Sequence, residues 1–582
     1  MTRKIARIAI LLDRRAAMRR WAYGLNVFDR WVGEMLAHAG LPFEWLDETR
    51  QVLEQGIDIV IAALPGEEQD DLDTLMRFAA RGGIVISYGG LNGLARSLGF
   101  RRCGSIGPGY ASMPFVHAED RPLRFLAAEP WALRDDSPKT HQAFGELYLS
   151  PPSRQSVSQT PLATLLQIPV DRGRIERWSV RVADTLVGLQ QGLSPLLEDG
   201  APAADGTAGL DDGLLKAEDT ITLDWQHDRV QTETGATYFA YPYADLWKES
   251  IIGHLLRSAL SIGRTLPFIA YWPDGVGQVA LISHDSDRNH DEDAITTLRE
   301  LADCGVTSTW CMMKPGYSVS LYDGIQKAGH ELALHFNANE NEGGSWSEAA
   351  FQRQHEWFVR TVGNGAVVSN KNHFTRFEGW GELYRWCEAC GLASDQTRGP
   401  SKRGTVGFLF GTCHPYFPIA WSDEQNRLYN VLEIGFLSQD LGSFTDFSVV
   451  VPLLRQVARV HGVAHFLFHQ GRIHSDPAVR NSLHRFVLTA KEEGFDFWTG
   501  KAIVEWLQLR RSFTIIGRDA NGDVLLRGDD SGTTVPRFVV WEPLDEGECK
   551  SIDDHLTELR FGVDCKRSSY IISGKGSVPG RS

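Results

Sequence analysis

The chain has 582 residues, 42% of them hydrophobic, and a formal net charge of -15. This length allows roughly three or four globular domains with buried cores. The negative charge, together with the lack of any run rich in Lys and Arg, argues against nucleic acid and anionic membranes as partners, so we expect a neutral or cationic partner.

The first apolar segment predicts a strand in a cytoplasmic protein. Residues 5–12 are too few for a signal peptide, are interrupted by Arg7, and lead into charged residues without a small-residue cleavage site. No apolar run approaches the roughly 20 residues that a membrane-spanning helix needs. The eight cysteines are sparse, which favours reduced thiols, and the C-x-x-C pair Cys387 and Cys390 lies in a helical pattern, which favours a core helix over a metal or redox site.

Strand and helix patterns alternate through residues 4–100. Strands are expected at 5–12, 43–46, 57–62 and 83–87, and helices at 27–39 and 70–81. This order is typical of a parallel sheet covered by helices. The series resembles the flavodoxin-like domain of class I glutamine amidotransferases, which occurs in non-catalytic form in some carbohydrate-active enzymes. The resemblance implies a cysteine between glycines after a strand, but the matching position reads Ser87-Tyr88-Gly89-Gly90-Leu91.

The next segment, residues 101–270, reads as a β-rich elaboration of the same domain. It contains a stretch near 198–212 that is rich in Ala, Gly and Asp, which favours a mobile loop, and a helix pattern at 246–261. Pro267 and Pro273 then mark a linker. We therefore expect a domain over 1–270 that carries no amidotransferase chemistry and could mediate a homo-oligomer.

Residues 274–510 show the most regular alternation. Strand patterns fall at 278–283, 307–312, 331–335, 366–369, 392–395, 428–436 and 463–469, with helix patterns at 292–303, 320–328, 347–361, 379–390 and 444–460 and a helix-strand-helix run over 476–510. The expected fold class is α/β: an irregular or open (β/α)7 barrel, preceded by the flavodoxin-like domain and followed by a small β-sandwich-like module over 511–582.

Acids and imidazoles gather where these strands end. In order they are Asp285 and Asp287, His335, Asn372 and His373, Asp395, Asp440, and His469. In (β/α) barrels the reacting groups come from the C-terminal ends of several strands. The pattern therefore predicts an active site at that end of the barrel.

The same residues resemble the motifs of the polysaccharide deacetylase (NodB-homology) family. Its first motif ends a strand with two Asp residues, a base followed by a metal ligand, and Asp285-Ser286-Asp287 looks like a variant of it. Its second motif is G-H-E followed by H-x-x-x-H, and here Gly329-His330-Glu331 is followed by His335, with Asn339 where the second His should stand. The resemblance implies that Asp285 is the base and that Asp287 and His335 bind a divalent metal.

Two residues compete for the third metal ligand. Asn339 could bind through its amide oxygen, which suits a harder ion such as Mn or Mg better than Zn, and His373 at the end of the fourth strand is the alternative. His330 is expected to be structural, because an offset of five residues places it on the opposite face of the strand from His335.

The remaining motifs imply further roles. Arg376 is similar in position to the family's base-orienting Arg, and Phe466-Leu467-Phe468-His469 matches its last motif, which makes His469 the general acid. Asp395 and Trp380 are expected to contact the carbohydrate substrate. Together these residues predict hydrolysis of an amide or ester, with an N- or O-acetylated sugar as substrate. A metal-free amidohydrolase and an inactive carbohydrate-binding or scaffold protein are the rival interpretations.

Overall fold

The computed structural model describes residues 3–54, 56–113, 121–135, 141–150, 162–363, 367–528, 537–545 and 557–570. The expected C-terminal module over 511–582 lies partly outside these ranges, and Cys549, one of the eight cysteines, lies outside them entirely.

The first part of the chain forms a nine-stranded sheet in the order β3-β2-β4-β5-β12-β11-β10-β7-β8. Neighbouring strands in the run β3-β2-β4-β5-β12 are parallel, and neighbouring strands in the run β12-β11-β10-β7-β8 are antiparallel. The strands are β2 (Ile8–Leu12), β3 (Glu44–Leu46), β4 (Ile59–Leu64), β5 (Ile84–Tyr88), β7 (Gly109–Ala111), β8 (Leu123–Phe125), β10 (Gln142–Tyr148), β11 (Ala163–Val170) and β12 (Gly173–Trp178). The expected parallel core is present, because β2, β4 and β5 are apolar on both faces and therefore need cover on both sides.

Helices flank this sheet. They are α1 (Arg14–Ala22), which the sequence did not predict, α2 (Trp31–Ala39), α3 (Gln69–Ala80), α4 (Val182–Gln191) and α5 (Tyr243–Ser261). Helix α1 has a mostly exposed, Arg-rich sequence that carries little apolar periodicity, and its start is fixed by the Asp13 side chain, which accepts the N–H of Ala16.

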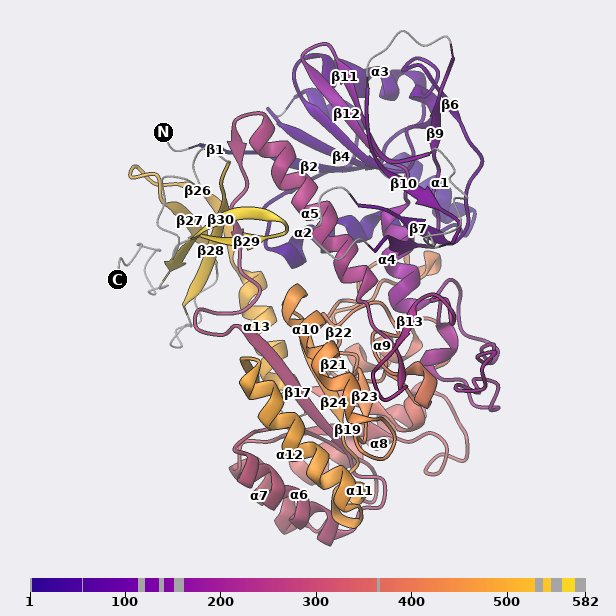
Figure 1. Cartoon of the computed structure of the whole chain (residues 1–582), viewed down its shortest axis with the longest axis vertical. Coiled ribbons are helices and arrows are strands. Elements are labelled where there is room, and N and C mark those ends of the chain that lie inside the picture. Colours follow the sequence, from indigo (N-terminus) through magenta and orange to yellow (C-terminus); the bar gives the residue numbers. More distant parts are fainter. Residues whose placement is uncertain are drawn as a thin grey trace.

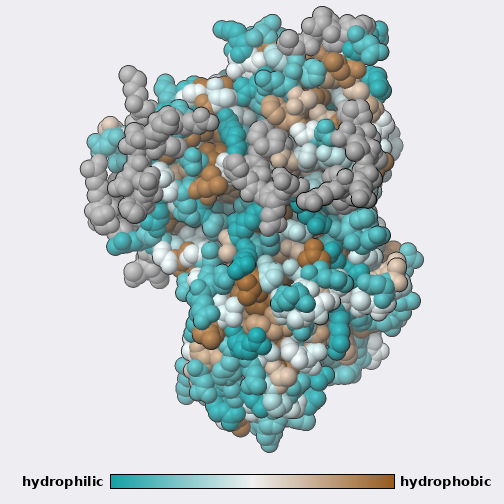
Figure 2. Space-filling view, viewed as in Figure 1, coloured by the Kyte–Doolittle hydropathy of each residue, from teal (hydrophilic) through white to brown (hydrophobic). Residues whose placement is uncertain are grey.

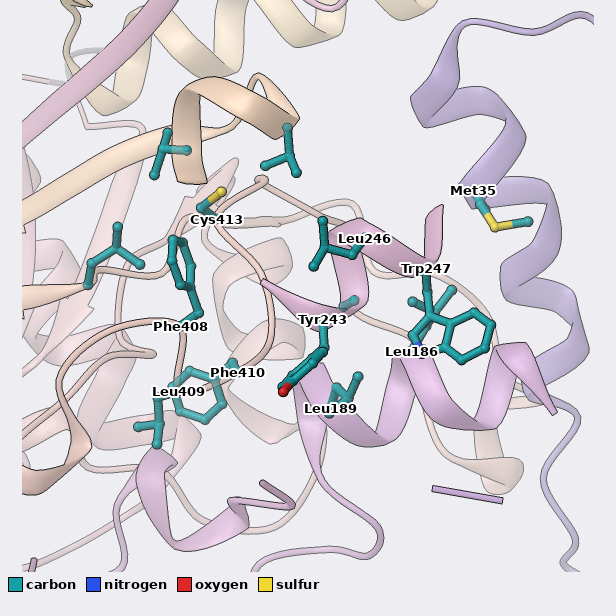
Figure 3. Close-up of a cluster of buried hydrophobic side chains, with 14 of the residues drawn as sticks. Met35, Leu186, Leu189, Tyr243, Leu246, Trp247, Phe408, Leu409, Phe410 and Cys413 are labelled. Carbon is teal, nitrogen blue, oxygen red and sulfur yellow. The ribbon is translucent and has the colours of Figure 1, made fainter. Parts of the chain in front are cut away.

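The first sheet and the rest of the chain share one hydrophobic core. Figure 3 shows Phe408, Leu409, Phe410 and Cys413 facing Tyr243 and Leu246, with Trp247, Leu186 and Leu189 beyond them and Met35 on α2 at the far side. Helix α5 is buried on nearly all sides because it lies between the two parts. The two parts are therefore packed as one body.

The second sheet is parallel throughout, in the order β22-β21-β20-β19-β18-β17-β24-β23, with β25 also pairing with β17. Its strands are β17 (Gln278–Asp285), β18 (Thr309–Met312), β19 (Glu331–Phe336), β20 (Ser369–Asn372), β21 (Ser394–Asp395), β22 (Leu432–Glu433), β23 (Ser438–Gln439), β24 (Val463–Leu467) and β25 (Phe495–Phe497). The two ends of this order, β22 and β23, are consecutive in the chain.

Two strand predictions need correction. The strand expected at 366–369 begins at Ser369, because β20 is built from Ser369-Asn370-Lys371-Asn372, whose polar side chains are buried inside the sheet and give no apolar signal. The strand expected at 428–436 shortens to β22, and a second short strand, β23, follows it and joins the opposite end of the sheet.

Helices cover the outside of this sheet (Figure 1). They are α6 (Asp291–Cys304), α7 (Val319–Lys327), α8 (Glu348–Val362), α9 (Glu382–Ala389), α10 (Val450–Val460), α11 (Gln470–Ser475), α12 (Pro477–Glu492) and α13 (Gly500–Ser512). Cys387 is buried in α9 with a free thiol, as the helical pattern predicted.

The C-terminal residues add short antiparallel strands. Strands β28 (Phe538–Pro543), β29 (Thr557–Arg560) and β30 (Val563–Tyr570) form a sheet with β16 (Phe268–Ile269), and β26 (Thr514–Arg518) pairs with β27 (Val524–Arg527). Because β16 comes from the expected linker, the linker and the tail fold together. Hydrophobic residues form small separate patches on the face in Figure 2, and no described helix is long and apolar enough to cross a membrane.

Candidate active site

Side chains from the C-terminal ends of four strands meet at one cavity. Asp285 ends β17 and Asp287 follows it, while His335 lies on β19, His373 follows β20 and His469 follows β24. Because the four strands belong to one parallel sheet, these ends lie at the same edge of the sheet. The cavity has a volume of about 580 Å³, and its walls include Asp285, Asp287, His373 and His469.

Asp287, His335 and His373 form a group that could hold a metal ion. His335 Nε2 lies 3.4 Å from Asp287 Oδ1, and His373 Nε2 lies 3.7 Å from the same oxygen. Ligand atoms about 2.1 Å from one tetrahedral zinc ion would lie about 3.4 Å apart, so the spacing suits such an ion.

Unpaired polar atoms support this assignment. Asp287 Oδ1 and His335 Nε2 are buried and have no hydrogen-bond partner among the described residues. The Nδ1 of His335 lies 3.0 Å from the carbonyl oxygen of Lys371, which selects the tautomer whose Nε2 lone pair faces Asp287. Two acceptors facing each other repel unless a proton or a cation lies between them, so the donor set fits a divalent cation.

Asn339, the other candidate for the third metal ligand, is not part of this group. Asn339 accepts a hydrogen bond from Arg376 through its Oδ1, so its amide is already occupied. His373 reaches Asp287 because the chain turns sharply after β20, where Phe374 and Thr375 have φ values of 59° and 53°. Of the two predicted alternatives, His373 is the one that the structure brings to Asp287 and His335.

Asp285 lies beside this group and has a cation of its own. Lys371 is fully buried on β20, and its Nζ lies 3.5 Å from Asp285 Oδ1. Burial raises the pKa of Asp285, but the charge of Lys371 and the nearby imidazoles of His335 and His469 outweigh burial and lower that pKa below its usual range. Asp285 is therefore ionised at neutral pH.

Arg376 does not contact Asp285. Its guanidinium donates to Glu378, to Asn339 and to the carbonyl of Gly344. Lys371, and not Arg376, is the cation that pairs with Asp285 among the described residues. Sequence reasoning missed Lys371 because a lysine within a short polar strand looks like an exposed one.

Lys371 belongs to a buried hydrogen-bonded chain beneath Asp285. Its Nζ donates to Ser283 Oγ at 3.1 Å, and Ser283 Oγ lies 2.8 Å from Nε2 of His465, whose Nδ1 lies 3.0 Å from the carbonyl oxygen of Ile434. Burial lowers the pKa of His465 to about 3, so this imidazole is neutral and accepts from Ser283.

His469 is paired with Asp440 at the other side of the cavity. The Nδ1 of His469 lies 2.7 Å from Asp440 Oδ2, and its backbone N–H donates to Asp440 Oδ1 at 2.9 Å. Burial lowers the pKa of His469, but Asp440, Asp287 and Asp285 outweigh it and raise the pKa to about 10. His469 is therefore a protonated imidazole whose Nε2 lies 3.6 Å from Asp287 Oδ2.

His373 and Asp287, two of the three side chains that could hold a metal, have lowered pKa values, in contrast to His469. Burial and the neighbouring His335 lower the pKa of His373 to about 4, so His373 is neutral. Burial raises the pKa of Asp287, but the nearby imidazoles of His335, His469 and His373 outweigh burial and hold that pKa well below its usual range. A neutral imidazole and an ionised carboxylate are the states in which these side chains bind metals.

Two predicted substrate contacts lie outside the cavity. Trp380 is buried, donates to the carbonyl of Ile419 and stacks on Phe28 with ring centroids 5.9 Å apart. Asp395 is fully buried, where it accepts from Asn370 and Thr397. His330 accepts the N–H of Ser308, in keeping with its expected structural role.

No protein-family model matches the chain, and no curated protein matches it. Among solved structures it is similar to a candidate polysaccharide deacetylase from Mycobacterium smegmatis, at 16% identity and a TM-score of 0.31 over 41% of this chain and 93% of that one. Two further structures match at 13% identity and a TM-score of 0.25. The CE4 domain of a xylanase from the hindgut metagenome of Trinervitermes trinervoides matches over 40% of this chain and 92% of that one, and a CE4 family pseudoenzyme from Bacillus anthracis over 40% and 66%.

Proposed function

We propose that this chain is a metal-dependent hydrolase that removes acetyl groups from an N- or O-acetylated carbohydrate. The observation that carries the proposal is the meeting of Asp285, Asp287, His335, His373 and His469 in two overlapping groups at one edge of the sheet, with Asp287 Oδ1 and His335 Nε2 buried and unpaired. The acetylated carbohydrate is proposed from the motif resemblance of Asp285-Ser286-Asp287, His335 and His469.

Asp287, His335 and His373 would hold the ion. A divalent ion bound there supplies Lewis acidity, which polarises an acyl oxygen and lowers the pKa of water. Two imidazoles and a carboxylate suit zinc, and they also accept other first-row ions.

Asp285 acts as the general base in this proposal. It is ionised and lies at the cavity wall, 3.7 Å from His335 Nε2 through its Oδ2, so it can take a proton from water placed between it and the acyl carbon. Lys371 keeps the carboxylate ionised and, because it is anchored to Ser283, holds it in place.

His469 acts as the general acid. It begins protonated and is oriented by Asp440, so its Nε2 can deliver a proton to the departing amine or alkoxide. One oxygen each of Asp285 and Asp287 and one ring nitrogen of His469 lie within 4.8 Å of one another, so the base and the acid can reach the same acyl group.

We propose that residues 1–270 form a non-catalytic domain, residues 274–510 the catalytic one and residues 511–582 an added module. The first region still supports the site, because Lys216 lines the cavity and pairs by an isolated bridge with Arg376. It would therefore shape substrate binding without carrying chemistry.

The test is acetate release by the purified full chain from N-acetylated chitooligosaccharides and from O-acetylated xylan. We expect release from at least one of them, its loss in Asp285→Asn and on chelation, and recovery when Zn²⁺ or Mn²⁺ is added back. The matched control is Asp496→Asn, an exposed carboxylate on β25, which pairs with the opposite end of β17 from Asp285.

Each contrary result removes a different part of the proposal. Release that persists in Asp285→Asn would remove the base, whereas full release after chelation would leave a metal-free amidohydrolase. Failure to release acetate from either polymer while the chain still binds one of them would favour an inactive binding protein.

A further inference from the structure

A second cavity lies where the N-terminal part, the second sheet and the C-terminal strands meet. Its volume is about 530 Å³, within the range of small-molecule sites. The elements that line it, α2, α5, α10, α13 and β29, lie around the junction of these parts in Figure 1. None of the five side chains of the proposed catalytic group lines it.

Three aromatic side chains from separate regions form one wall of this cavity. The ring centroids of His38, Tyr271 and His414 lie 4.6 to 4.8 Å from one another. His38 comes from α2, Tyr271 from the segment after β16, and His414 from the loop before β22. The wall therefore exists only because the three regions are packed together.

Each of these side chains leaves a polar atom without a partner. His38 Nε2, the Tyr271 hydroxyl and His414 Nδ1 are buried and make no hydrogen bond within the described ranges. His38 is 9% exposed and His414 6% exposed. Three such atoms on one cavity wall are unusual, since buried polar groups are almost always paired and an unpaired one destabilises the fold.

The protonation states tell which partners these atoms need. The Nε2 of His414 lies 2.6 Å from the carbonyl oxygen of Val460, so that nitrogen carries the proton. Burial lowers the pKa of His414 to about 4, and burial together with Lys248 lowers that of His38. His414 Nδ1 is thus an acceptor at neutral pH and needs a donor such as a hydroxyl, whereas the Tyr271 hydroxyl can donate.

An unbalanced positive charge lies in the same wall. Arg510 is 2% exposed and lies 5.2 Å from the ring centroid of Tyr271. It donates to the carbonyls of Ala270 and Ile269, and no carboxylate in the described part of the chain forms an ion pair with it. Its neighbour Arg511, in contrast, pairs with Glu34. A buried unpaired charge is costly, and an anion in the cavity would offset it.

The backbone of Gly40 lies very close to both Ile269 in the linker and the guanidinium of Arg510. Gly40, the C-cap of α2, has a φ of 76° and accepts the N–H of Ile269, and a Cβ there would lie 2.4 Å from the Ile269 carbonyl oxygen and 2.8 Å from the guanidinium of Arg510. Only glycine fits this contact. The cation is therefore fixed in position rather than carried on a mobile side chain.

We propose that this cavity is a binding site for a small hydroxylated organic anion, in which Arg510 meets the anionic group and Tyr271, His38 and His414 meet hydroxyls. The aromatic rings offer apolar faces to the body of such a molecule. A carboxylate and a phosphate would both pair with Arg510 in this way, and the titration below distinguishes them.

The test is calorimetric titration of the full chain with D-glucuronate and with D-glucose 6-phosphate. Methyl β-D-glucoside, which lacks the anion, and hexanoate, which lacks the hydroxyls, are the controls. We expect at least one hydroxylated anion to bind at least about tenfold more tightly than both controls, since charge-assisted hydrogen bonds are roughly twice as strong as neutral ones.

Two variants place the binding in this cavity. Tyr271→Phe keeps the ring and removes a hydroxyl without a described partner, so we expect thermal stability to be equal or higher and binding to weaken about threefold to tenfold. Arg510→Met should weaken it by more than about tenfold. Asp287→Ala, in the other cavity, should leave binding unchanged.

Three results would overturn the proposal. They are no binding of either hydroxylated anion, equal binding of a control compound, and unchanged binding in Tyr271→Phe. If Arg510→Met does not fold, Tyr271→Phe decides alone, because its substitution removes no observed contact. Loss of binding in Asp287→Ala would assign the anion to the catalytic cavity instead.

Discussion

Replacing Asp440 by Asn tests how the charge of His469 is maintained. The carboxylate of Asp440 contacts both Nδ1 and the backbone N–H of His469, at 2.7 and 2.9 Å. Asn keeps the size but removes the negative charge, and its single acceptor oxygen can serve only one of these two N–H groups. The substitution therefore changes electrostatics with little change in packing.

The size of the effect follows from the kind of hydrogen bond that is lost. A bond to a charged group contributes about 1.5 to 3 kcal/mol and a neutral one about 0.5 to 1.5 kcal/mol, so the exchange costs roughly 1 to 2 kcal/mol. Because one pKa unit is about 1.36 kcal/mol, the pKa of His469 should fall by about one unit. The side chain is 24% exposed, so water screens part of the interaction and favours the lower end of this range.

The assay is NMR titration of side-chain ¹⁵N-labelled histidines, which needs no substrate. We expect His469 to titrate near 10 in the parent chain and about one unit lower in Asp440→Asn. The alkaline limb of the pH profile for acetate release should move by the same amount. A parent value near 6.5, or no shift in the variant, would refute the assignment of Asp440 and of His469 as a standing acid.

Three further outcomes test the rest of the site and the core. His373→Ala should weaken Zn²⁺ binding in a chelator competition by more than about tenfold, whereas Asn339→Ala should change it less than about threefold; equal losses would mean that His373 is not a ligand. Lys371→Met should raise the pKa of Asp285 and move the acidic limb of activity to higher pH, and an unmoved limb would remove that cation from the mechanism. Finally, unfolding by urea should become easier as the pH falls from 6.5 toward 4. Buried histidines with depressed pKa values bind protons only in the unfolded chain, so the stability they contribute is complete above about pH 6.5 and falls by about 1.4 kcal/mol per histidine and pH unit below it. A stability that does not change over this range would contradict the assigned protonation states. These histidines are His284, His414 and His465.

The parts of the site that the sequence predicted lie at the ends of apolar strands. Strands β17 and β24 are mostly apolar, so Asp285 at the end of β17 and His469 shortly after β24 could be located from hydropathy. His335 was found through its motif. Periodicity is informative in these strands because both faces are buried in the same apolar core.

The parts that the sequence left open depend on which strands are neighbours. Asn339 stood at the motif position and His373 was only the alternative in the chain. Because β20 pairs with β19 so that Lys371 is opposite His335, the fold brings the region just after β20 to the metal group. The sequence alone could not distinguish Trp380, a core residue, from a tryptophan that stacks on a sugar, because its contacts with Phe28 and the Ile419 carbonyl come from distant segments. Order along the chain does not reveal either arrangement.

The buried polar strand β20 links these two observations. Lys371 in the centre of a sheet would be strongly destabilising if it were alone, because a buried charge without a partner costs several kcal/mol. Its Nζ is balanced by Asp285 and anchored by Ser283, which in turn contacts the neutral His465. A sheet selected for stability alone would place apolar residues at these positions. The polar interior is therefore best explained by the site above it, since it fixes the charge and position of Asp285 while the adjacent backbone carbonyl of Lys371 fixes the tautomer of His335.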